Sequence, residues 1–240
     1  MGKDRLFEDP DMKQPFRFDE RVAEVFDDML DRSIPGYRDV IRITGELLAA
    51  FLEPYDRILD LGCSTGTTLL YLAERLTNLN PRLTGVDDSE AMIHRARTKT
   101  SAYNRKETCF QRADIRSFPI PEGTGAVLLQ YTLQFLAPED RLPLMVRIRQ
   151  GLRRGGVLIL SEKIRFDDAE IDRRFIETYH RFKETQGYSK LEIARKRDAL
   201  ENVLIPWTAA KNEQLLRDAG FRTVDSFFQW FNFRSWVAMM

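Results

Sequence analysis

A glycine-containing turn is the first segment whose residue types could do chemistry. Residues 60–66, Asp-Leu-Gly-Cys-Ser-Thr-Gly, follow a short apolar run and precede an amphipathic stretch. Gly62 permits a tight turn, and Gly66 permits close packing of a helix on a strand. Backbone N–H groups of such a turn can bind a carboxylate or a phosphate. Ser64 replaces the middle glycine of the usual pattern, so a purely structural turn also fits at this point.

Two further acidic sites follow the next two predicted strands. Asp87 and Asp88 end the second strand, 21 residues after Gly66 (87 − 66). A carboxylate at this place can accept both hydroxyls of a ribose. Asp114 and Ile115 follow the third strand, where the acid can accept an adenine amino group and the isoleucine can pack on the ring. A single aspartate is more often a helix cap, but three strand-end groups in this order predict an adenosine cofactor.

The choice among adenosine cofactors rests on the glycine pattern and on the end of the chain. An NAD domain would share the turn and the ribose acid, but it has a more complete glycine fingerprint. The two β-rich runs 221–230 and 231–239 are too close together to be parallel neighbours. An antiparallel ending is typical of methyltransferase-like domains. We therefore expect S-adenosylmethionine rather than NAD.

The elements that position these groups alternate between apolar strands and amphipathic helices. The predicted strands are 57–61, 83–86, 108–112, 126–129 and 157–160, with helices at 67–79, from Ser89 and around 142–152. Such alternation indicates βαβ units and a parallel sheet covered on both faces. We predict a class I methyltransferase-like (Rossmann-like) α/β fold with a seven-stranded, mostly parallel sheet and an antiparallel C-terminal strand. Gly155 and Gly156 are expected to turn the chain into the fifth strand.

The chain divides into four predicted parts. Residues 1–56 form an N-terminal helical extension or lid, with a loosely ordered start up to Pro15 and a helix that Asp19 opens. Residues 57–163 form the S-adenosylmethionine-binding α/β core. Residues 164–207 form a helical insertion that is too long for a simple crossover and is expected to cover the active site. Residues 208–240 supply the last helix and the antiparallel strands that complete the core.

Composition narrows the partners and the compartment. The 37 basic and 37 acidic side chains cancel, so no global charge draws the chain to nucleic acid or to an anionic membrane. The two cysteines make a disulfide framework improbable, and no apolar run approaches the roughly 20 residues of a membrane helix. The two histidines, His94 and His180, lack metal-ligand spacing. We expect a cytoplasmic protein without a metal.

Several segments spread over nearly the whole chain resemble one family, the carboxy-S-adenosyl-L-methionine synthases of bacterial tRNA wobble-uridine modification. The segments are 18–26 (FDERVAEVF), 32–37 (RSIPGY), 60–64 (DLGCS), 132–136 (TLQFL), 160–163 (LSEK), 187–189 (GYS), 196–197 (KR) followed by 200–203 (LENV), and 231–233 (FNF). Many of them lie outside the generic cofactor fold. The resemblance is therefore more specific than the glycine turn alone.

The resemblance implies a particular reaction and particular partners. The reaction converts S-adenosylmethionine and prephenate into carboxy-S-adenosylmethionine and phenylpyruvate. The product then serves a separate enzyme that carboxymethylates tRNA, so no direct binding of nucleic acid is expected. The resemblance also implies a homodimer. Two alternatives stay open: an ordinary S-adenosylmethionine-dependent methyltransferase of small molecules, and a non-catalytic cofactor-binding partner protein.

The resemblance also implies a set of site residues. The positions that match or replace cofactor contacts are Tyr37, Gly62, Cys63, Ser64, Asp87, Asp88, Asp114, Ile115 and Gln130. Asp88 and Gln130 both stand where an asparagine is familiar in the family, so the fine geometry at these two positions is in question. Arg197 matches the arginine that holds the added carboxylate, and it is the residue to which we assign the catalytic role. Cys63 is interpreted as a small packing residue and not as a nucleophile.

The position of Arg197 can also be weighed without the family. In a helix predicted over 191–204, Arg197 lies on one stripe with Ile193, Leu200 and Leu204. A buried guanidinium needs an anionic partner, because desolvating an unpaired charge is costly. A carboxylate ligand held in a two-point fork would supply that partner. The alternatives are an arginine that extends to the rim of the site or one that pairs with a structural acid.

A group of basic residues in and before the insertion could attract a dianionic substrate. Its members are Lys163, Arg165, Arg173, Arg174 and Arg181. Solvated helix faces explain most of these residues equally well.

Overall fold

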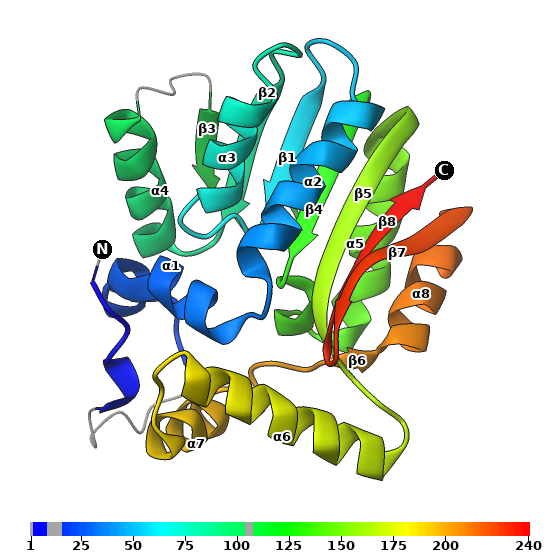
Figure 1. Cartoon of the computed structure of the whole chain (residues 1–240). Helices are drawn as coiled ribbons and strands as arrows, with labels where there is room; N and C mark the ends of the chain where they lie inside the picture. Colours follow the sequence, from blue (N-terminus) through cyan, green and yellow to red (C-terminus); the bar gives the residue numbers. More distant parts are fainter. Residues whose placement is uncertain (1, 9–15, 104–107) are drawn as a thin grey trace.

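The computed structural model describes residues 2–8, 16–103 and 108–240 of the chain. One mixed sheet forms its centre, with helices on both faces (Figure 1). The strands are β1 (Arg57–Leu61), β2 (Arg82–Asp87), β3 (Thr108–Arg112), β4 (Thr124–Gln130), β5 (Leu152–Arg165), β6 (Trp207–Thr208), β7 (Thr223–Trp230) and β8 (Phe233–Met239). The main path runs β3-β2-β1-β4-β5-β8-β7, and the short β6 pairs with the end of β5.

The direction of the strands is the predicted one. The neighbours from β3 to β5 are all parallel, and β8 lies antiparallel between β5 and β7. The mostly parallel sheet with an antiparallel C-terminal strand is therefore confirmed, and the short β6 adds an eighth strand that was not predicted. The carboxyl ends of the parallel strands share one edge of the sheet, and ligands bind at this edge in open α/β folds.

Five helices of the described residues begin at a residue whose side chain accepts a hydrogen bond from the first turn. The helices are α1 (Glu20–Ser33), α2 (Tyr37–Phe51), α3 (Thr67–Arg75), α4 (Glu90–Ala102), α5 (Pro138–Gly151), α6 (Ala169–Thr185), α7 (Lys190–Ala199) and α8 (Ala209–Asp218), with short 3₁₀ turns η1 (Leu6–Glu8) and η2 (Leu133–Phe135). Asp19 accepts a hydrogen bond from the Val22 N–H at the start of α1. Ser189 and Glu192 form a reciprocal capping box at the start of α7.

The central strand β4 shows how the sheet is buried. Ala126 and Leu128 pack into the core that side chains of α2, α3 and α4 complete. Val127 and Leu129 alternate with them and face the core formed with α5 and α8. All four side chains are fully buried, as expected for a parallel strand with helices on both faces. This core fixes the positions of the strand ends that carry the site.

Three predicted boundaries are wrong. Gly155 and Gly156 lie inside β5, which starts at Leu152; a register shift against β4 accommodates them. The helix after the glycine turn ends at Arg75 and not at residue 79. The second helix of the insertion ends at Ala199 and not at residue 204, and Asn202 then adopts a left-handed φ of 60°.

The additions to the core gather at one edge of the sheet. Figure 1 shows α1, α6 and α7 beneath the edge where the parallel strands end. The first residues were expected to be loosely ordered, yet η1 packs beside α7 and Phe7 is buried, whereas residues 9–15 lie outside the described part of the chain. Within the ranges described above, no helix is long and apolar enough to cross a membrane.

Candidate cofactor and substrate site

A cavity of about 520 Å³ opens at the carboxyl ends of the parallel strands. Nine of the ten predicted site residues line it: Tyr37, Gly62, Cys63, Ser64, Asp87, Asp88, Asp114, Ile115 and Gln130. Side chains from α1, β5, α6 and α7 close the rest of its wall. The fold therefore brings together residues that lie up to 93 positions apart in the sequence (130 − 37).

The glycine turn has backbone conformations that its sequence explains. Gly62 has a φ of 81°, and a Cβ atom there would lie 2.3 Å from the Thr132 side chain. Its N–H donates to the Val86 carbonyl at 2.7 Å. Ser64 also has a positive φ, 48°, although it carries a side chain. A left-handed serine is strained, and such strain is characteristic of functional turns.

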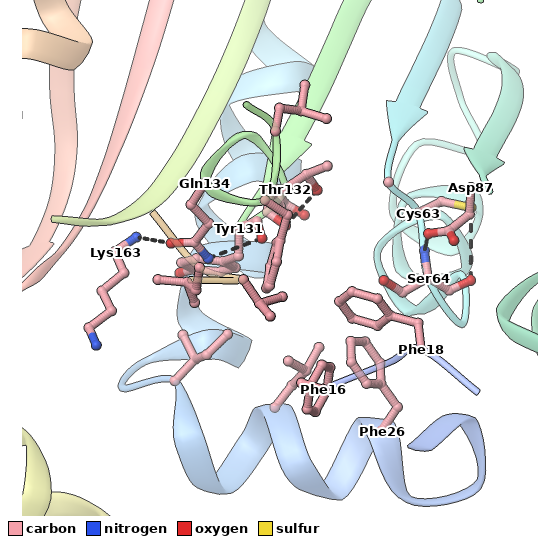
Figure 2. A pocket seen from close by; sticks show the side chains of 18 of the residues that line it. Phe16, Phe18, Phe26, Cys63, Ser64, Asp87, Tyr131, Thr132, Gln134 and Lys163 are labelled. Atoms are coloured by element: carbon pink, nitrogen blue, oxygen red, sulfur yellow. Dashed lines mark hydrogen bonds between the residues drawn. The ribbon is translucent and has the colours of Figure 1, made fainter. Parts of the chain in front are cut away.

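Asp87 ties this turn to the end of β2. Its Oδ2 accepts from the Ser64 N–H at 2.9 Å (Figure 2). Its Oδ1 accepts from the Ser89 N–H at 3.0 Å. Burial raises the pKa of Asp87 to about 6 in spite of these two bonds. Burial and then the charge of Asp87 raise the pKa of Asp60 to about 7. Two partly protonated carboxyl groups at a strand end can accept hydrogen bonds from hydroxyl or ammonium groups of a ligand.

The residues expected around an adenine ring lie at the ends of β2 and β3. Ile115 is buried, while Asp88 is exposed at the rim of the cavity. Asp114 accepts from the Arg116 guanidinium at 2.7 and 3.0 Å, and this hydrogen bonding lowers the pKa of the carboxyl group. Asp114 therefore stays ionised next to the apolar Ile115 side chain, and its carboxylate can accept a hydrogen bond from a donor such as an amino group.

The amide of Gln130 is engaged within the protein. Its Oε1 accepts from the Thr68 hydroxyl at 2.7 Å, and its Nε2 donates to the Thr44 hydroxyl at 3.3 Å. The longer side chain that replaces the familiar asparagine therefore joins β4 to α2 and α3. A ligand contact at Gln130 would use the remaining hydrogen-bonding capacity of this amide.

Aromatic side chains form the middle of the cavity wall. Tyr37, the first residue of α2, lies 6.4 Å from the Tyr131 ring between centroids. Burial, followed by the charge of Asp27, raises the pKa of Tyr37, so its hydroxyl stays protonated. Figure 2 shows Phe16 and Phe18 on the same side of the pocket as α1. These rings leave an apolar space next to the glycine turn.

Cys63 has the environment of a packing residue. Its side chain is buried, and a Cβ atom on Gly85 would lie 2.7 Å from its sulfur. Burial, followed by the charges of Asp60 and Asp87, raises the pKa of the thiol well above its usual value. A thiol that is not ionised is a poor nucleophile.

Arg197 does not lie where the helical stripe predicted. Its side chain is 64% exposed, pairs with Asp198 at 2.8 Å and is not part of the cavity wall. Leu200 and Leu204 of the stripe do line the cavity, but within α7 it is Lys196 that is buried, because it pairs with the buried Asp4, and Arg197 is turned outward. The neighbouring Lys196 enters the cavity wall instead.

A buried network that spacing did not reveal joins α1 to the glycine turn. Asp27 accepts from the hydroxyls of Thr65 and Thr67 at 2.6 and 2.7 Å. The Lys99 ammonium lies 2.8 Å from the same carboxylate and donates to Thr67 at 2.6 Å. This network fixes the end of the turn against α1 and α4.

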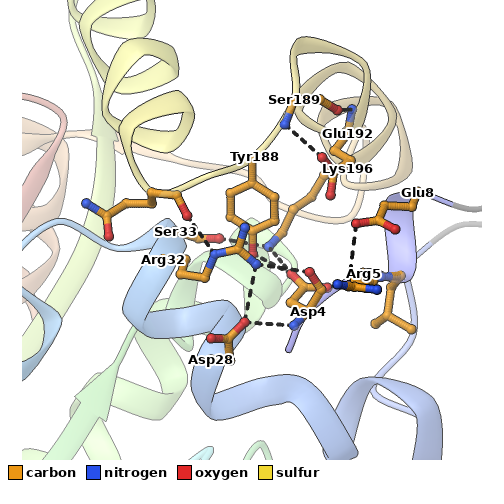
Figure 3. A network of polar contacts seen from close by, with 12 residues as sticks. Asp4, Arg5, Glu8, Asp28, Arg32, Ser33, Tyr188, Ser189, Glu192 and Lys196 are labelled. Carbon is orange, nitrogen blue, oxygen red and sulfur yellow. Dashed lines mark hydrogen bonds and ion pairs between the residues drawn. The ribbon is translucent and has the colours of Figure 1, made fainter. Parts of the chain in front are cut away.

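A second network ties the N-terminal residues to the insertion (Figure 3). The Asp4 carboxylate is fully buried, accepts from the Tyr188 hydroxyl and lies 3.7 Å from the Lys196 ammonium. Lys196 also donates to Ser33 at 2.8 Å, and the Arg32 guanidinium stacks 3.9 Å from the centre of the Tyr188 ring. The network therefore determines where α7 meets the cavity.

The described residues contain no group of three His, Cys, Asp or Glu side chains that could hold a metal ion. The expectation of a site without a metal stays a prediction. Of the two histidines, His180 lies on α6 beside the cavity residue Tyr179.

Comparisons with known proteins agree with this geometry. A family model described as a methyltransferase domain matches residues 58–156. A protein from Methanococcus maripaludis, described as a candidate S-adenosyl-L-methionine-dependent methyltransferase, has a TM-score of 0.63 at 16% identity, with 95% of each chain covered. Human N-acetylserotonin methyltransferase has a TM-score of 0.61 at 17% identity, with 92% of this chain and 55% of that chain covered. The fold is thus that of the class I S-adenosylmethionine-dependent methyltransferases.

Curated relatives define the family more narrowly. The carboxy-S-adenosyl-L-methionine synthase of Desulfotalea psychrophila is 48% identical over 238 residues, which cover 99% of this chain and 97% of that protein. The synthase of Wolinella succinogenes is 44% identical, with 98% of both chains covered. The chain belongs to the carboxy-S-adenosyl-L-methionine synthase family, a family of enzymes.

Proposed function

We propose that this enzyme converts S-adenosylmethionine and prephenate into carboxy-S-adenosylmethionine and phenylpyruvate. The observation that carries the proposal is one continuous cavity that joins the glycine turn to an aromatic and basic end lined by Lys163 and Lys196. This cavity offers room for a second small anion beside the cofactor. The relatives of nearly equal length are named carboxy-S-adenosyl-L-methionine synthases, which supports the carboxylated product.

The residues of the site fit S-adenosylmethionine in several ways. Gly62 leaves the backbone of the turn open, because any side chain there would collide with Thr132. Asp87 offers carboxylate oxygens to the ribose hydroxyls, and Asp114 with Ile115 offers an acceptor and an apolar surface to the adenine. Tyr37 covers the cofactor from the start of α2. These assignments make Asp88 and Gln130 peripheral contacts.

The proposed reaction balances without a further reactant. The cofactor supplies a sulfonium methyl group, which loses a proton and gains the carboxyl group that leaves the prephenate ring. The ring also loses its hydroxyl group as it becomes aromatic, so the proton and the hydroxide leave together as water. The protein is required to hold the two substrates in contact and to exclude bulk water.

The exposed position of Arg197 supports a role in a second copy of the chain. Its guanidinium lies outside the cavity of its own chain, yet the family resemblance assigns it to the added carboxylate and implies a homodimer. We propose that Arg197 of one protomer reaches the cavity of its partner. A guanidinium on the surface can make such a two-point contact without prior burial.

Mixed dimers test this assignment. A dimer that combines an Arg197→Ala chain with an Asp87→Ala chain has one cavity with an intact Asp87 and an Arg197 from the partner. Such dimers should form product, while each variant alone should not. Inactive mixed dimers, with wild-type dimers active under the same conditions, would place Arg197 in its own cavity. Full activity of Arg197→Ala alone would place it outside the reaction.

Mass analysis of the reaction tests the function itself. Incubation with S-adenosylmethionine and prephenate should yield S-adenosylmethionine plus the mass of one carbon dioxide unit, together with phenylpyruvate. S-adenosylhomocysteine without the carboxylated product would indicate an ordinary methyltransferase. If no acceptor gives turnover, the remaining alternative is that the chain is a non-catalytic, cofactor-binding partner protein.

The proposed setting follows from the same reasoning. The product would serve a separate enzyme that modifies the tRNA wobble uridine. The synthase itself would act in the cytoplasm as a homodimer. Its balanced charge gives no reason for it to bind tRNA directly.

A further inference from the structure

Two lysines from different elements meet over one tyrosine ring at the basic end of the cavity. The Lys163 ammonium, at the end of β5, lies 5.2 Å from the centre of the Tyr179 ring. The Lys183 ammonium, one turn after Tyr179 on α6, lies 4.4 Å from the same centre. Tyr179 and Lys163 both line the cavity. Figure 2 shows Lys163 on the opposite side of the pocket from Asp87.

Neither of these lysines has a carboxylate partner among the described residues. The other buried lysines of the cavity region do have one: Lys99 pairs with Asp27, and Lys196 pairs with Asp4. Asp172 is too far from Lys163 to form an ion pair with it, and only its charge influences the pKa of Lys163. The Asp172 Oδ1 already accepts a hydrogen bond from the Phe166 N–H at 2.8 Å.

The remaining basic residues of the predicted group behave differently. Arg173 and Arg174 are exposed and pair with Glu170 on the surface of α6, and Arg181 is exposed as well. These side chains form a solvated helix face. Lys163 is the member of the group that reaches the cavity wall.

The charges around these lysines add to one another. Burial, followed by the charges of Lys163, Lys196 and Arg197, lowers the pKa of Lys183 to about 7. Burial and then the charges of Lys183 and Lys163 lower the pKa of His180 to about 4. Cations from β5, α6 and α7 therefore act on the same volume, and an anion placed there would relieve their repulsion.

Packing alone does not explain why two such ammonium groups are kept. Removing an ammonium from water without a partner is costly, and contact with an aromatic ring recovers only part of that cost. An apolar side chain of similar length would pack on Tyr179 more favourably. Destabilising groups of this kind are characteristic of ligand sites.

We infer that Lys163, on the cavity wall, forms an anion subsite that binds a carboxylate of the second substrate, and that Lys183, on the same Tyr179 ring, adds its charge to this subsite. The inference rests on the proposed function for the identity of that substrate. Prephenate has two carboxylates, and an ion pair on the one attached to the ring would oppose its loss because it stabilises the bound form. The subsite therefore holds the carboxylate of the side chain, which remains in the product.

Variants that remove one charge at a time test the subsite. Lys163→Met and Lys183→Met should each raise the KM for prephenate by about tenfold or more, the scale of a lost charge-assisted hydrogen bond. The Kd for S-adenosylmethionine, measured by calorimetry, should stay within about twofold. Lys183→Arg should recover part of the prephenate affinity. Lys190→Met is the matched control, because it removes the same charge from an exposed position on α7.

A thermal unfolding measurement separates a ligand role from a structural one. Lys183→Met should leave Tm unchanged or raise it, because the variant removes an unpaired buried charge. A lower Tm together with an unchanged KM would mean that the lysine serves the fold, and it would overturn the inference. A KM equal to that of Lys190→Met in both variants would overturn it as well.

The subsite can be tested even if the proposed reaction fails. Absence of carboxylated product from the wild-type enzyme would refute the proposed function alone. Glutarate, a small dicarboxylate, would then be titrated into the complex with S-adenosylmethionine. Weaker binding to Lys163→Met and Lys183→Met than to Lys190→Met would support the subsite, and equal binding to all three would overturn it.

Discussion

The pair between Asp27 and Lys99 should make a large contribution to stability. The Asp27 side chain is 4% exposed, and its carboxylate accepts from Thr65, Thr67 and Lys99. Replacing Asp27 with alanine leaves the ammonium and two hydroxyls without their acceptor. Breaking a buried pair in this way costs about 3 kcal/mol or more. A chain of this size loses about 2–4 °C in Tm for each kcal/mol, so Tm should fall by roughly 6–12 °C.

A double-mutant cycle of Asp27→Leu, Lys99→Met and the variant with both changes isolates the pair itself. Asp27→Leu combined with Lys99→Met removes both charges, and apolar replacements of a buried pair are often close to neutral. The double variant should therefore recover most of the lost stability. Because Asp27 orients the end of the glycine turn, Asp27→Ala should also weaken S-adenosylmethionine binding, and calorimetry would measure this change.

A surface pair provides the matched control. Glu46 and Arg75 lie 2.8 Å apart but are about half exposed, and solvent screens such a surface pair, so it contributes little to stability. Urea unfolding of Glu46→Ala and Asp27→Ala gives the comparison directly. Equal losses in the two variants would refute the reasoning, because burial would then not have amplified the Asp27 interaction.

The pH dependence of the pair has a definite sign. Burial alone would raise the pKa of Asp27, but Lys99 and the two hydroxyls outweigh it and the net pKa is lowered. The stabilisation is therefore present above the unfolded-state pKa of about 3.9 and is lost as pH falls through the lower folded-state value. Asp27→Ala should reduce this acid sensitivity in unfolding experiments.

Three further outcomes are expected. Burial raises the pKa of Asp87 to about 6, so the affinity for S-adenosylmethionine should fall as the pH decreases through about 6. Calorimetry across this range measures the affinity, and an affinity that does not change with pH would show that the Asp87 carboxylate does not bind the cofactor. Iodoacetamide near neutral pH should modify the exposed Cys109 before the buried Cys63, and peptide mass analysis showing the reverse would contradict a protonated packing thiol. Asp4→Ala should lower the free energy of unfolding by about 3 kcal/mol, because it leaves the buried Lys196 unpaired. If urea unfolding of this variant matched the wild type, the hydrogen bond to Ser33 alone would satisfy the Lys196 ammonium.

The strand-end residues could be predicted because parallel strands impose a simple geometry. Gly62, Asp87 and Asp114 each follow an apolar run, and the carboxyl ends of such strands meet at one edge. The helix N-caps Asp19 and Ser89 could be predicted for a similar reason, because a cap and its helix are adjacent in sequence. These features depend on short stretches of chain.

Arg197 shows where this kind of reasoning ends. Successive helical residues point about 100° apart, so the choice between Lys196 and Arg197 as the inward residue depends on where the helix lies and ends. The inward position of Lys196 is fixed by Asp4, which is 192 residues away in the sequence (196 − 4). No periodicity within α7 carries that information. Contacts of this range come only from the folded chain.

The residues proposed to bind the cofactor and the residues proposed to bind the second substrate lie in different parts of the chain. The methyltransferase-domain match covers residues 58–156, which include Gly62, Asp87 and Asp114. Lys163, Tyr179, Lys183 and Lys196 all lie beyond it, on β5 and the insertion. The solved structures share the fold at 14–20% identity, whereas the curated relatives match across nearly the whole chain. We therefore expect cofactor binding to depend on the common core and selection of the proposed second substrate to depend on the elements that close the cavity. Exchange of Lys163 and Lys183 should then change the substrate without loss of the cofactor.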